Sequence, residues 1–462
     1  MAVNWREWVE DRFALEPIRE VGFLRKVPGT PWYYGDGAAL VLLFGVLVVT
    51  GMFLALSYSP SPDTAYSSVR YLTERATLGW FVRGLHYWSA GLMMVMAWFH
   101  LFREIIVGGY RMPREGTWFL GVLLLFGIFI MSFTGYLLRW DERALYSTLL
   151  SLHMFQNIPL IGDEIVLFVQ GGPELGARTL TRFYAMHLLF TPAAMGLVLA
   201  GHLYLIYRHG VTSAAERRER IQSREQQRAL YAREKERGEP FYPDTMAKSG
   251  LFALAVFLMA AGLALFSGPL PMYPEANLVN STMPQGEWWY WWYSALIALV
   301  PSRIAPWLVV IFPPLLFLAL VALPFLDRNP YRDIRRRPWM GAAVTASAAT
   351  LLWLSYLRYH SPWTGWPTEA LPPVPQEVRL SPRAQEGRAL FSRYGCNSCH
   401  PIAGRGPHVG PDLMRIGRRR TPAQTRSQIL GPPPGSPMPS YADRLSEEEL
   451  SRLVTFLMEL QR

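Results

Sequence analysis

The chain of 462 residues contains only two cysteines, and they lie three positions apart near its C-terminus. Cys396 and Cys399 are followed directly by His400, which gives the pattern Cys-x-x-Cys-His. Two thiols at this spacing can add to both vinyl groups of one haem, and the adjacent imidazole then faces the iron. A redox dithiol would need the strand–helix pattern of a thioredoxin fold, and a zinc site would need a fourth ligand nearby. The sequence offers neither, so we predict one covalent c-type haem.

The second axial ligand of this iron should be a thioether or another imidazole. Met438 stands between two prolines just before the last predicted helix, and we predict that it is the ligand. Met414 and Met458 fall on predicted helices and are assigned to the core, while His408 is the rival ligand. Ligation by Met and His raises the haem potential and suits electron transfer.

Four further histidines lie in two apolar stretches at matched spacing. His86 and His100 are 14 residues apart, and His187 and His202 are 15 apart. On a helix, either spacing returns to roughly one face after a rise of about 21 Å. A lone apolar-face histidine is usually a satisfied core residue. Four in two matched pairs, at a depth where polar groups are costly, indicate metal ligands instead.

The elements that must hold these histidines are those of a membrane protein. Hydrophobic residues make up 51% of the chain and charged residues only 17%. The formal net charge of +10 does not indicate nucleic acid, because the basic residues cluster in loops between apolar runs. Residues 4–21 predict an amphipathic helix on the membrane surface, and we find no cleavable signal peptide.

Seven stretches without Asp, Glu, Lys or Arg can each hold the roughly 20 residues of a membrane-spanning helix. They are residues 37–62, 84–102, 116–138, 183–207, 249–274, 304–326 and 338–357. The run 144–162 contains several polar residues and is predicted to be interfacial, and 288–302 is too short to span. The fold class is therefore all-α, a membrane bundle of about seven transmembrane helices.

The distribution of Lys and Arg among the loops predicts how the bundle is oriented in the membrane. Loops on the side of the N-terminus carry 23 Lys and Arg, and those on the opposite side carry 8. The positive-inside rule then places the N-terminus in the cytoplasm and the C-terminus outside. The second and fourth spans run in the same direction, so the histidines meet as an outer pair, His86 with His187, and an inner pair, His100 with His202. We predict two non-covalent b-type haems.

Glycines on two other spans repeat the histidine spacing. Gly37 and Gly51 lie 14 residues apart on the first span, and Gly121 and Gly135 lie 14 apart on the third. A flat porphyrin needs close approach to the backbone, which glycine permits. Glycine is common in membrane helices, but this repeated spacing predicts that the four glycines line the haems.

Beyond the last span the composition changes. Residues 361–382 hold six prolines and predict a stiff, extended tether. A small soluble domain follows and ends in an amphipathic helix over 446–460. The earlier segment 211–238 is rich in Arg, Glu and Gln and predicts a solvated cytoplasmic helix without chemistry.

Residues 1–210 resemble the cytochrome b of quinol:cytochrome c oxidoreductases and are closer to the short form found in plastid cytochrome bf complexes. Besides the histidines, the resemblance rests on "HLFREIIVGGYRMPRE" (100–115), "FTGYLLRWD" (133–141) and "TLTRFYAMH" (179–187). The next part resembles the three-helix subunit IV through "PFYPD" (240–244), "GEWWYWWYSAL" (286–296) and "FLDRNPYRDIRRRP" (325–338). The end resembles a class I cytochrome c. The expected domains are 1–210, dihaem cytochrome b; 211–358, linker and subunit IV-like helices; 359–381, tether; 382–462, monohaem cytochrome c.

The resemblance implies roles for further residues. It assigns the outer histidine pair to a low-potential haem and the inner pair to a high-potential one. Arg83 and Arg103 flank the ligands and are expected to meet haem propionates, with interfacial anchoring as the alternative. Gly35 stands where bf-type proteins have a cysteine that holds an extra haem, so no further covalent haem is expected.

The family's Pro-Glu-Trp-Tyr motif lines its outer quinol-oxidation site, and its glutamate accepts a quinol proton. The match here, Gly286-Glu287-Trp288-Trp289, keeps the glutamate and the following tryptophan. Glu287 is therefore the expected proton acceptor, with a surface glutamate on a rim loop as the alternative. Arg139 is a second departure, at a position where the family usually has proline, and is expected to reshape the loop over the site.

The predicted function is that of a quinol–cytochrome c reductase subunit in the cell's inner membrane. Quinol is oxidised at the outer site. One electron leaves through a Rieske iron–sulfur protein to the c haem, and the other crosses both b haems to an inner quinone site. The chain has no Rieske-like Cys–His pairs, so that protein must be separate. The family implies a homodimer, and the electron acceptor would be a cytochrome c or an oxidase.

Two rival functions stand beside this prediction. The first is a membrane-anchor electron conduit between a dehydrogenase and the quinone pool, without bifurcation, and the altered glutamate motif is its only support. The second is a transporter with haems attached, for which charged residues inside a span would be expected. The predicted spans contain none.

Overall fold

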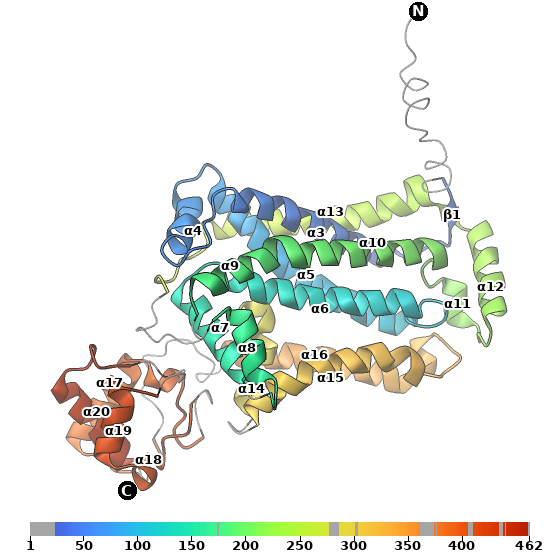
Figure 1. Cartoon of the computed structure of the whole chain (residues 1–462). Helices are drawn as coiled ribbons and strands as arrows, with labels where there is room; N and C mark the ends of the chain where they lie inside the picture. The colour runs from blue at the N-terminus through green and yellow to red at the C-terminus, as the bar shows by residue number, and fades with distance from the viewer. Residues whose placement is uncertain are drawn as a thin grey trace, which may run out of the picture.

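Seven long apolar helices cross the molecule side by side in the computed structural model (Figure 1). The structure describes residues 24–156, 158–172, 175–276, 286–300, 304–360, 374–375, 377–404, 410–433, 438 and 440–460. Within them the spanning helices are α3 (Asp36–Ala55), α5 (Gly79–Val107), α6 (Glu115–Leu137), α9 (Ala177–Ala185) with α10 (Thr191–His209), α13 (Met246–Ser267), α15 (Ala305–Leu326) and α16 (Pro338–His360). The predicted all-α class and seven spans are confirmed.

Two spanning helices end well inside the charge-free runs that predicted them. The first helix ends at Ala55, although the charge-free run extends to residue 62, because the residues after Ala55 are rich in serine and proline, which form turns. The fifth ends at Ser267, where Gly268 has a φ of 62°. Absence of charge marks apolar sequence, but glycine and proline decide where the helix stops.

Short elements cap both ends of the bundle. At one end lie α4 (Ala65–Glu74), α7 (Glu142–Phe155), α8 (Gly162–Gln170), η5 (Trp288–Tyr290) and α14 (Trp291–Leu299). At the other lie α11 (Ala214–Arg218), α12 (Arg224–Glu236), η6 (Ile334–Arg336) and the antiparallel pair β1 (Lys26–Val27) and β2 (Glu239–Pro240). Neither predicted non-spanning run crosses the bundle, as expected. We call these the outer and inner ends, following the predicted orientation.

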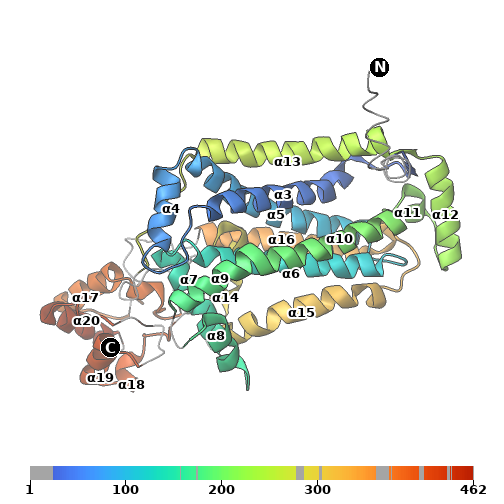
Figure 2. The same ribbon diagram turned by 45° about the horizontal axis from the view of Figure 1, so that its top comes forward.

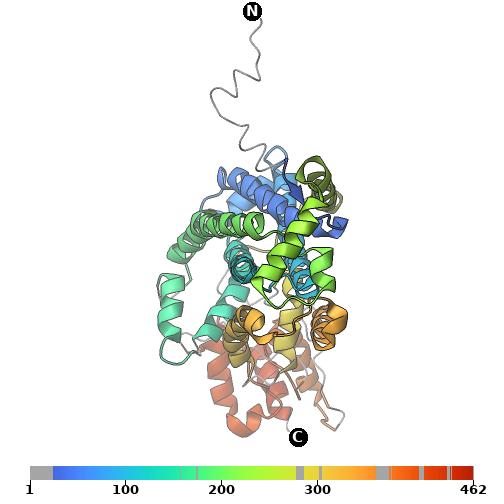
Figure 3. The ribbon, with the colours of Figure 1, turned by 90° about the vertical axis from the view of Figure 1, so that its right-hand side faces the viewer.

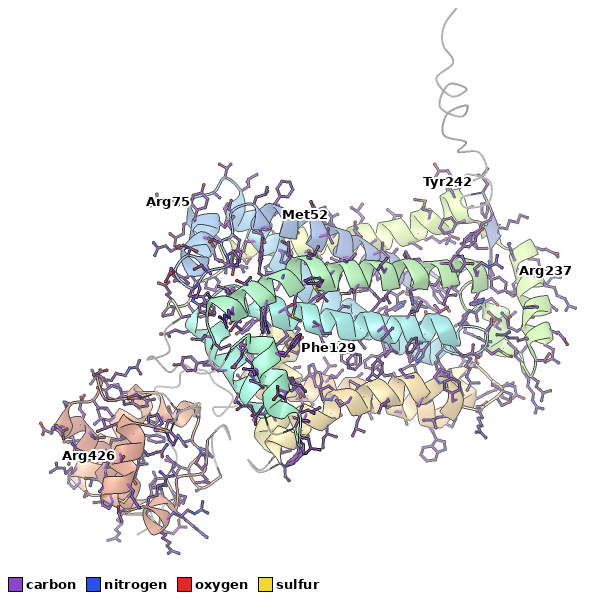
Figure 4. The ribbon with its side chains drawn as sticks, in the orientation of Figure 1. Met52, Arg75, Phe129, Arg237, Tyr242 and Arg426 are labelled. Carbon is purple, nitrogen blue, oxygen red and sulfur yellow. The ribbon has the colours of Figure 1, made fainter. Side chains whose placement is uncertain are left out.

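Helices from distant parts of the sequence pack closely. In Figure 2, α13 lies along α3, and small residues make the contact of α13 with α5 possible: Ala260 and Ala264 are fully buried, and a Cβ on Gly84 would lie 3.4 Å from Ala264 Cβ. On the outside, large apolar side chains such as Met52 remain exposed, while Phe129 lies between helices (Figure 4). This is the surface expected of a bundle in lipid.

The inner-end segment 211–238 is not simply solvated, contrary to expectation. Its Glu216 is fully buried, 3.0 Å from Arg114 and 3.7 Å from Arg332, and accepts a hydrogen bond of 2.9 Å from Gln227 Nε2. Burial alone would raise the pKa of Glu216, but the two guanidinium groups hold it below its usual value. The segment therefore ties the first four spans to the last three.

The C-terminal domain is a separate helical unit at the outer end (Figures 1 and 3). It comprises α17 (Pro382–Arg393), η8 (Cys396–Ser398), α18 (Ile416–Arg419), α19 (Pro422–Leu430) and α20 (Glu447–Glu459). Phe391, Leu450 and Phe456 are buried in its core. The predicted amphipathic last helix corresponds to α20, whose apolar face supplies much of that core.

Candidate haem and quinol sites

The outer histidine pair is brought together as predicted. The rings of His86 on α5 and His187, in a π-helical turn between α9 and α10, have centroids 6.2 Å apart. His86 Nδ1 lies 2.9 Å from Thr50 Oγ1, and His187 Nδ1 lies 3.0 Å from the carbonyl oxygen of Met131. Each Nε2 is thus left for a metal. With metal–nitrogen bonds of about 2 Å, the spacing suits one ion between the rings.

In the inner pair, each Nδ1 also lies against a polar group, with one difference. His202 Nδ1 lies 2.9 Å from the carbonyl oxygen of Thr117. His100 Nδ1 instead lies 3.3 Å from a carboxylate oxygen of Asp36 and 3.1 Å from an Arg103 nitrogen. Sequence reasoning missed Asp36, because charged residues were used only to mark the ends of spans.

The four predicted glycines each lie against a different histidine. A Cβ added at the glycine would meet Cε1 of the ring as follows: Gly135 with His187 at 2.5 Å, Gly121 with His202 at 3.2 Å, Gly51 with His86 at 3.4 Å and Gly37 with His100 at 3.6 Å. The glycine spacing repeats the histidine spacing for this reason. The backbone of α3 and α6 comes close enough to hold the imidazoles, which fits a cradle for two haems.

Arg83 and Arg103 are buried, which disfavours simple anchoring at the lipid surface. Arg83 donates to Thr73 Oγ1 at 2.9 Å and to the Leu270 carbonyl at 3.0 Å. Arg103 makes a two-pronged ion pair with Asp36, with distances of 2.6 and 2.8 Å. Their predicted role toward propionates stays a prediction.

The Cys-x-x-Cys-His motif lies on η8 and the turn after it. His400 Nδ1 is 2.9 Å from the Pro411 carbonyl, so its Nε2 is left for a metal. Met438 is partly buried against the domain core and stays the predicted ligand. Met414 also packs against that core but lies in a turn, not on a helix as predicted. His408 lies outside the described residues.

An apolar cavity of about 650 Å³ is lined in part by Thr134, whose hydroxyl lies 3.3 Å from His187 Nδ1. It is lined by residues of α6, α7, α8, η5, α14 and α15, among them Phe129, Phe133, Ile165, Tyr290 and Pro313. A neighbouring cavity of about 530 Å³ is more polar, and Tyr87, Tyr136, Arg139 and Arg143 are part of its wall. Glu287 lines both cavities. It is therefore not a rim residue in open solvent.

The glutamate motif is fixed to α6. Trp289 Nε1 donates to Ser132 Oγ at 2.9 Å, and Tyr290 OH donates to the Phe129 carbonyl at 3.3 Å. Burial raises the pKa of the Glu287 carboxyl above its usual value, although Arg139 and a hydrogen bond from Tyr87 act in the opposite direction. The site holds a carboxyl group suited to take up a proton.

The structure also shows what surrounds Arg139 and Gly35, the two other departures from the family pattern. Arg139 Nη1 lies 3.1 Å from Glu287 Oε1, and its Nε lies 3.2 Å from Asp141 Oδ2. At the inner end, a Cβ on Gly35 would lie 2.7 Å from Phe252 Cβ. Helix α13 thus fills the place into which a longer side chain at position 35 would extend.

Comparisons with known proteins agree with this arrangement. Residues 26–210 match the family model described as cytochrome b/b6/petB, and residues 382–457 match that of the cbb3-type cytochrome c oxidase subunit III. The menaquinol:cytochrome c reductase cytochrome b subunit of Bacillus subtilis is 37% identical over 215 residues, covering 45% of this chain and 96% of the relative.

Longer matches extend beyond the four-helix core. Cytochrome b of Allochromatium vinosum is 29% identical over 338 residues, 70% of this chain and 80% of the relative. A solved structure of a hyperthermophilic respiratory Complex III covers 78% of this chain and 92% of its own, with a TM-score of 0.65 and 25% identity.

The chain belongs to the cytochrome b/b6 family and carries a cytochrome c domain at its C-terminus. Within that family it is the cytochrome b of a bc-type quinol:cytochrome c oxidoreductase, an integral membrane protein with b- and c-type haems that is part of a multisubunit complex.

Proposed function

We propose that this chain oxidises quinol in the apolar outer cavity and sends its two electrons along different routes. When bound, two b haems would carry one electron to an inner quinone site, and one c haem would pass the other, received through a separate Rieske protein, to an outer cytochrome c or oxidase. The observation that carries the proposal is Glu287, which lines an apolar cavity at the same end of the bundle as the His86/His187 pair.

The residues of the chain divide this work. The aromatic and aliphatic wall of the cavity excludes water and holds the apolar quinol. The Glu287 carboxylate accepts a proton from the quinol hydroxyl and releases it toward the polar cavity, whose wall it also forms. His86, His187, His100 and His202 would hold the b haems, and Cys396, Cys399, His400 and Met438 the c haem.

We further propose the cytoplasmic membrane as the location, with the N-terminus inside and the cytochrome c domain outside, and a homodimer as the assembly. The loop charges support the orientation, since 23 Lys and Arg lie on one side and 8 on the other. The domain limits 1–210, 211–358, 359–381 and 382–462 remain our proposed division of the chain.

The ligand sets can be tested by haem content. We expect two b haems and one c haem per chain, hence a pyridine haemochrome ratio of b to c near two. A ratio near one, or two covalent haems per chain by mass, would contradict the assignment.

The site itself can be tested with Glu287→Gln, which keeps size and removes titration. Reduction of the outer b haem and the c haem by quinol should slow, while reduction of the b haems backward from the inner site stays nearly unchanged. Full reductase activity in this variant, or a purified complex without a 2Fe–2S signal, would favour the electron-conduit alternative.

A further inference from the structure

Arg139 forms an ion pair with the Glu287 carboxylate. Its guanidinium reaches Glu287 over a sequence separation of 148 residues, with Nη1 to Oε1 at 3.1 Å. The Arg139 side chain is 20% exposed and that of Glu287 only 12%, so water screens the pair incompletely. A contact of this kind strongly influences where the carboxylate lies.

The walls of the two cavities show on which side of Glu287 the Arg139 guanidinium lies. Glu287 lines both, but Arg139 lines only the polar one. The guanidinium is itself held in place: it pairs with Asp141 at 3.2 Å and lies over the Tyr136 ring at 4.4 Å. Asp141 is fixed in turn, since its carboxylate caps α7 by accepting from Ala144 N at 2.9 Å. The positive charge therefore stays on the polar side of the glutamate.

We propose that Arg139 is a positioning residue that draws the Glu287 carboxylate toward the polar cavity and keeps it ionised between turnovers. This rests on the proposed role of Glu287 as proton acceptor. After each proton transfer, the ion pair favours release of the proton on the side away from the bound quinol. When the next quinol enters the apolar cavity, the Glu287 carboxylate is therefore ionised and can accept a proton.

Other charged and titratable groups around Glu287 do not replace this contact. In the described part of the chain, those on the elements packed around it are Arg83 and Tyr87 of α5, Tyr136 of α6, Asp141, Arg143 of α7, Tyr273, Tyr290, Tyr293 of α14 and Arg358 of α16. After burial, Arg139 has the largest influence on the pKa of Glu287 and lowers it, whereas Asp141 raises it by a smaller amount. Arg143, which lies over the Tyr273 ring at 3.6 Å, is not among the main influences.

The test is the pH dependence of quinol oxidation in the purified complex. Arg139→Gln removes the charge, so the pKa of Glu287 rises and ionised base is lost at a higher pH. The acid limb of the rate profile should shift upward by roughly one unit or more and the rate should recover at alkaline pH. Arg143→Gln removes the same charge from the same cavity wall and should leave the acid limb in place.

Infrared titration of the Glu287 carboxyl band should show the same upward shift of its pKa in Arg139→Gln, without turnover. The band is identified from the difference between the spectra of the wild type and Glu287→Gln. Should Arg139→Gln fail to assemble, the double variant Arg139→Gln with Asp141→Asn removes both charges of the ion pair and keeps an oxygen to cap α7. It should still shift the limb upward, because Arg139 has the larger effect.

The outcomes distinguish the positioning role of Arg139 from the proton-acceptor role of Glu287 on which it rests. An acid limb that does not move in Arg139→Gln, while Glu287→Gln remains slow, overturns the role of Arg139 alone. Full activity of Glu287→Gln overturns the proton-acceptor assignment itself. In the Glu287→Gln background, Arg139→Gln should cause no further shift, and any shift there contradicts a role that acts through the glutamate.

Discussion

The outer and inner ends of the bundle use buried carboxylates for different purposes. At the outer end, Glu287 borders two cavities and forms an ion pair with Arg139. At the inner end, Glu216 is enclosed by Arg114, Arg332 and Gln227. The first carboxylate has room to change its partner, and the second does not. We infer that the outer end is built for proton transfer and that the inner contact holds the two halves of the membrane domain together.

The histidine pairs repeat this contrast in weaker form. The outer imidazoles contact a hydroxyl and a carbonyl oxygen, which are neutral. At the inner end, His100 contacts the Asp36–Arg103 ion pair. Each end can therefore be altered separately, and the variants below should affect one end without the other.

The largest effect is expected from loss of a ligand. His187→Leu should remove the outer b haem and slow quinol-driven reduction of the c haem by roughly 100-fold or more, since even losing an outer-shell partner costs 10–100-fold. His202→Leu should remove the inner b haem instead. Haem content and low-temperature b-band spectra distinguish the two, and loss of both haems in either variant would argue against independent sites.

The next largest effect concerns the cytochrome c domain at the outer end. Met438→Ala should leave the haem attached but lower its potential sharply, because the thioether favours reduced iron. Met458→Ala, on α20, is the matched control and should leave the potential in place. A potentiometric titration decides, and an unchanged potential in Met438→Ala would point to His408 or another ligand.

At the inner end, Glu216→Ala should lower the free energy of unfolding by about 3–5 kcal/mol, because it leaves two buried cations without their anion. Thermal unfolding in detergent measures this. The pKa of Glu216 is lowered in the folded state, so its stabilisation is present at neutral pH and disappears as the pH falls through that lowered value. Glu287→Gln should barely change stability, and a large loss there would break the contrast between the two carboxylates.

The smallest effect is expected from replacing the glycines that lie against the histidines, and it should differ between Gly135 and Gly37. Gly135→Ala places a methyl group 2.5 Å from His187 and should cost about 1–3 kcal/mol, with reduced outer b haem content. Gly37→Ala meets His100 only at 3.6 Å and should displace the imidazole less. Equal loss of haem in both variants would contradict the contact geometry.

Much of this arrangement was predictable because it repeats along the chain. The spans follow from long apolar runs, and the outer histidine pair, confirmed as neighbours, follows from helical spacing and direction. Contacts between distant segments left no such local signal. Helical periodicity does not relate the residues of three contacts: Arg139 with Glu287, Glu216 with Arg332, and Asp36 with Arg103. The sequence therefore did not predict these contacts, and only the packed structure shows them.

The most direct test of the central claim is a single turnover of the purified complex with quinol, following b- and c-haem absorbance together. If quinol is oxidised at Glu287 with its electrons divided, the first turnover reduces one b haem and one c haem at the same rate. Glu287→Gln should then slow both equally. Reduction of the c haem without a b haem, or b-haem reduction by quinol at the wild-type rate in Glu287→Gln, would contradict the account.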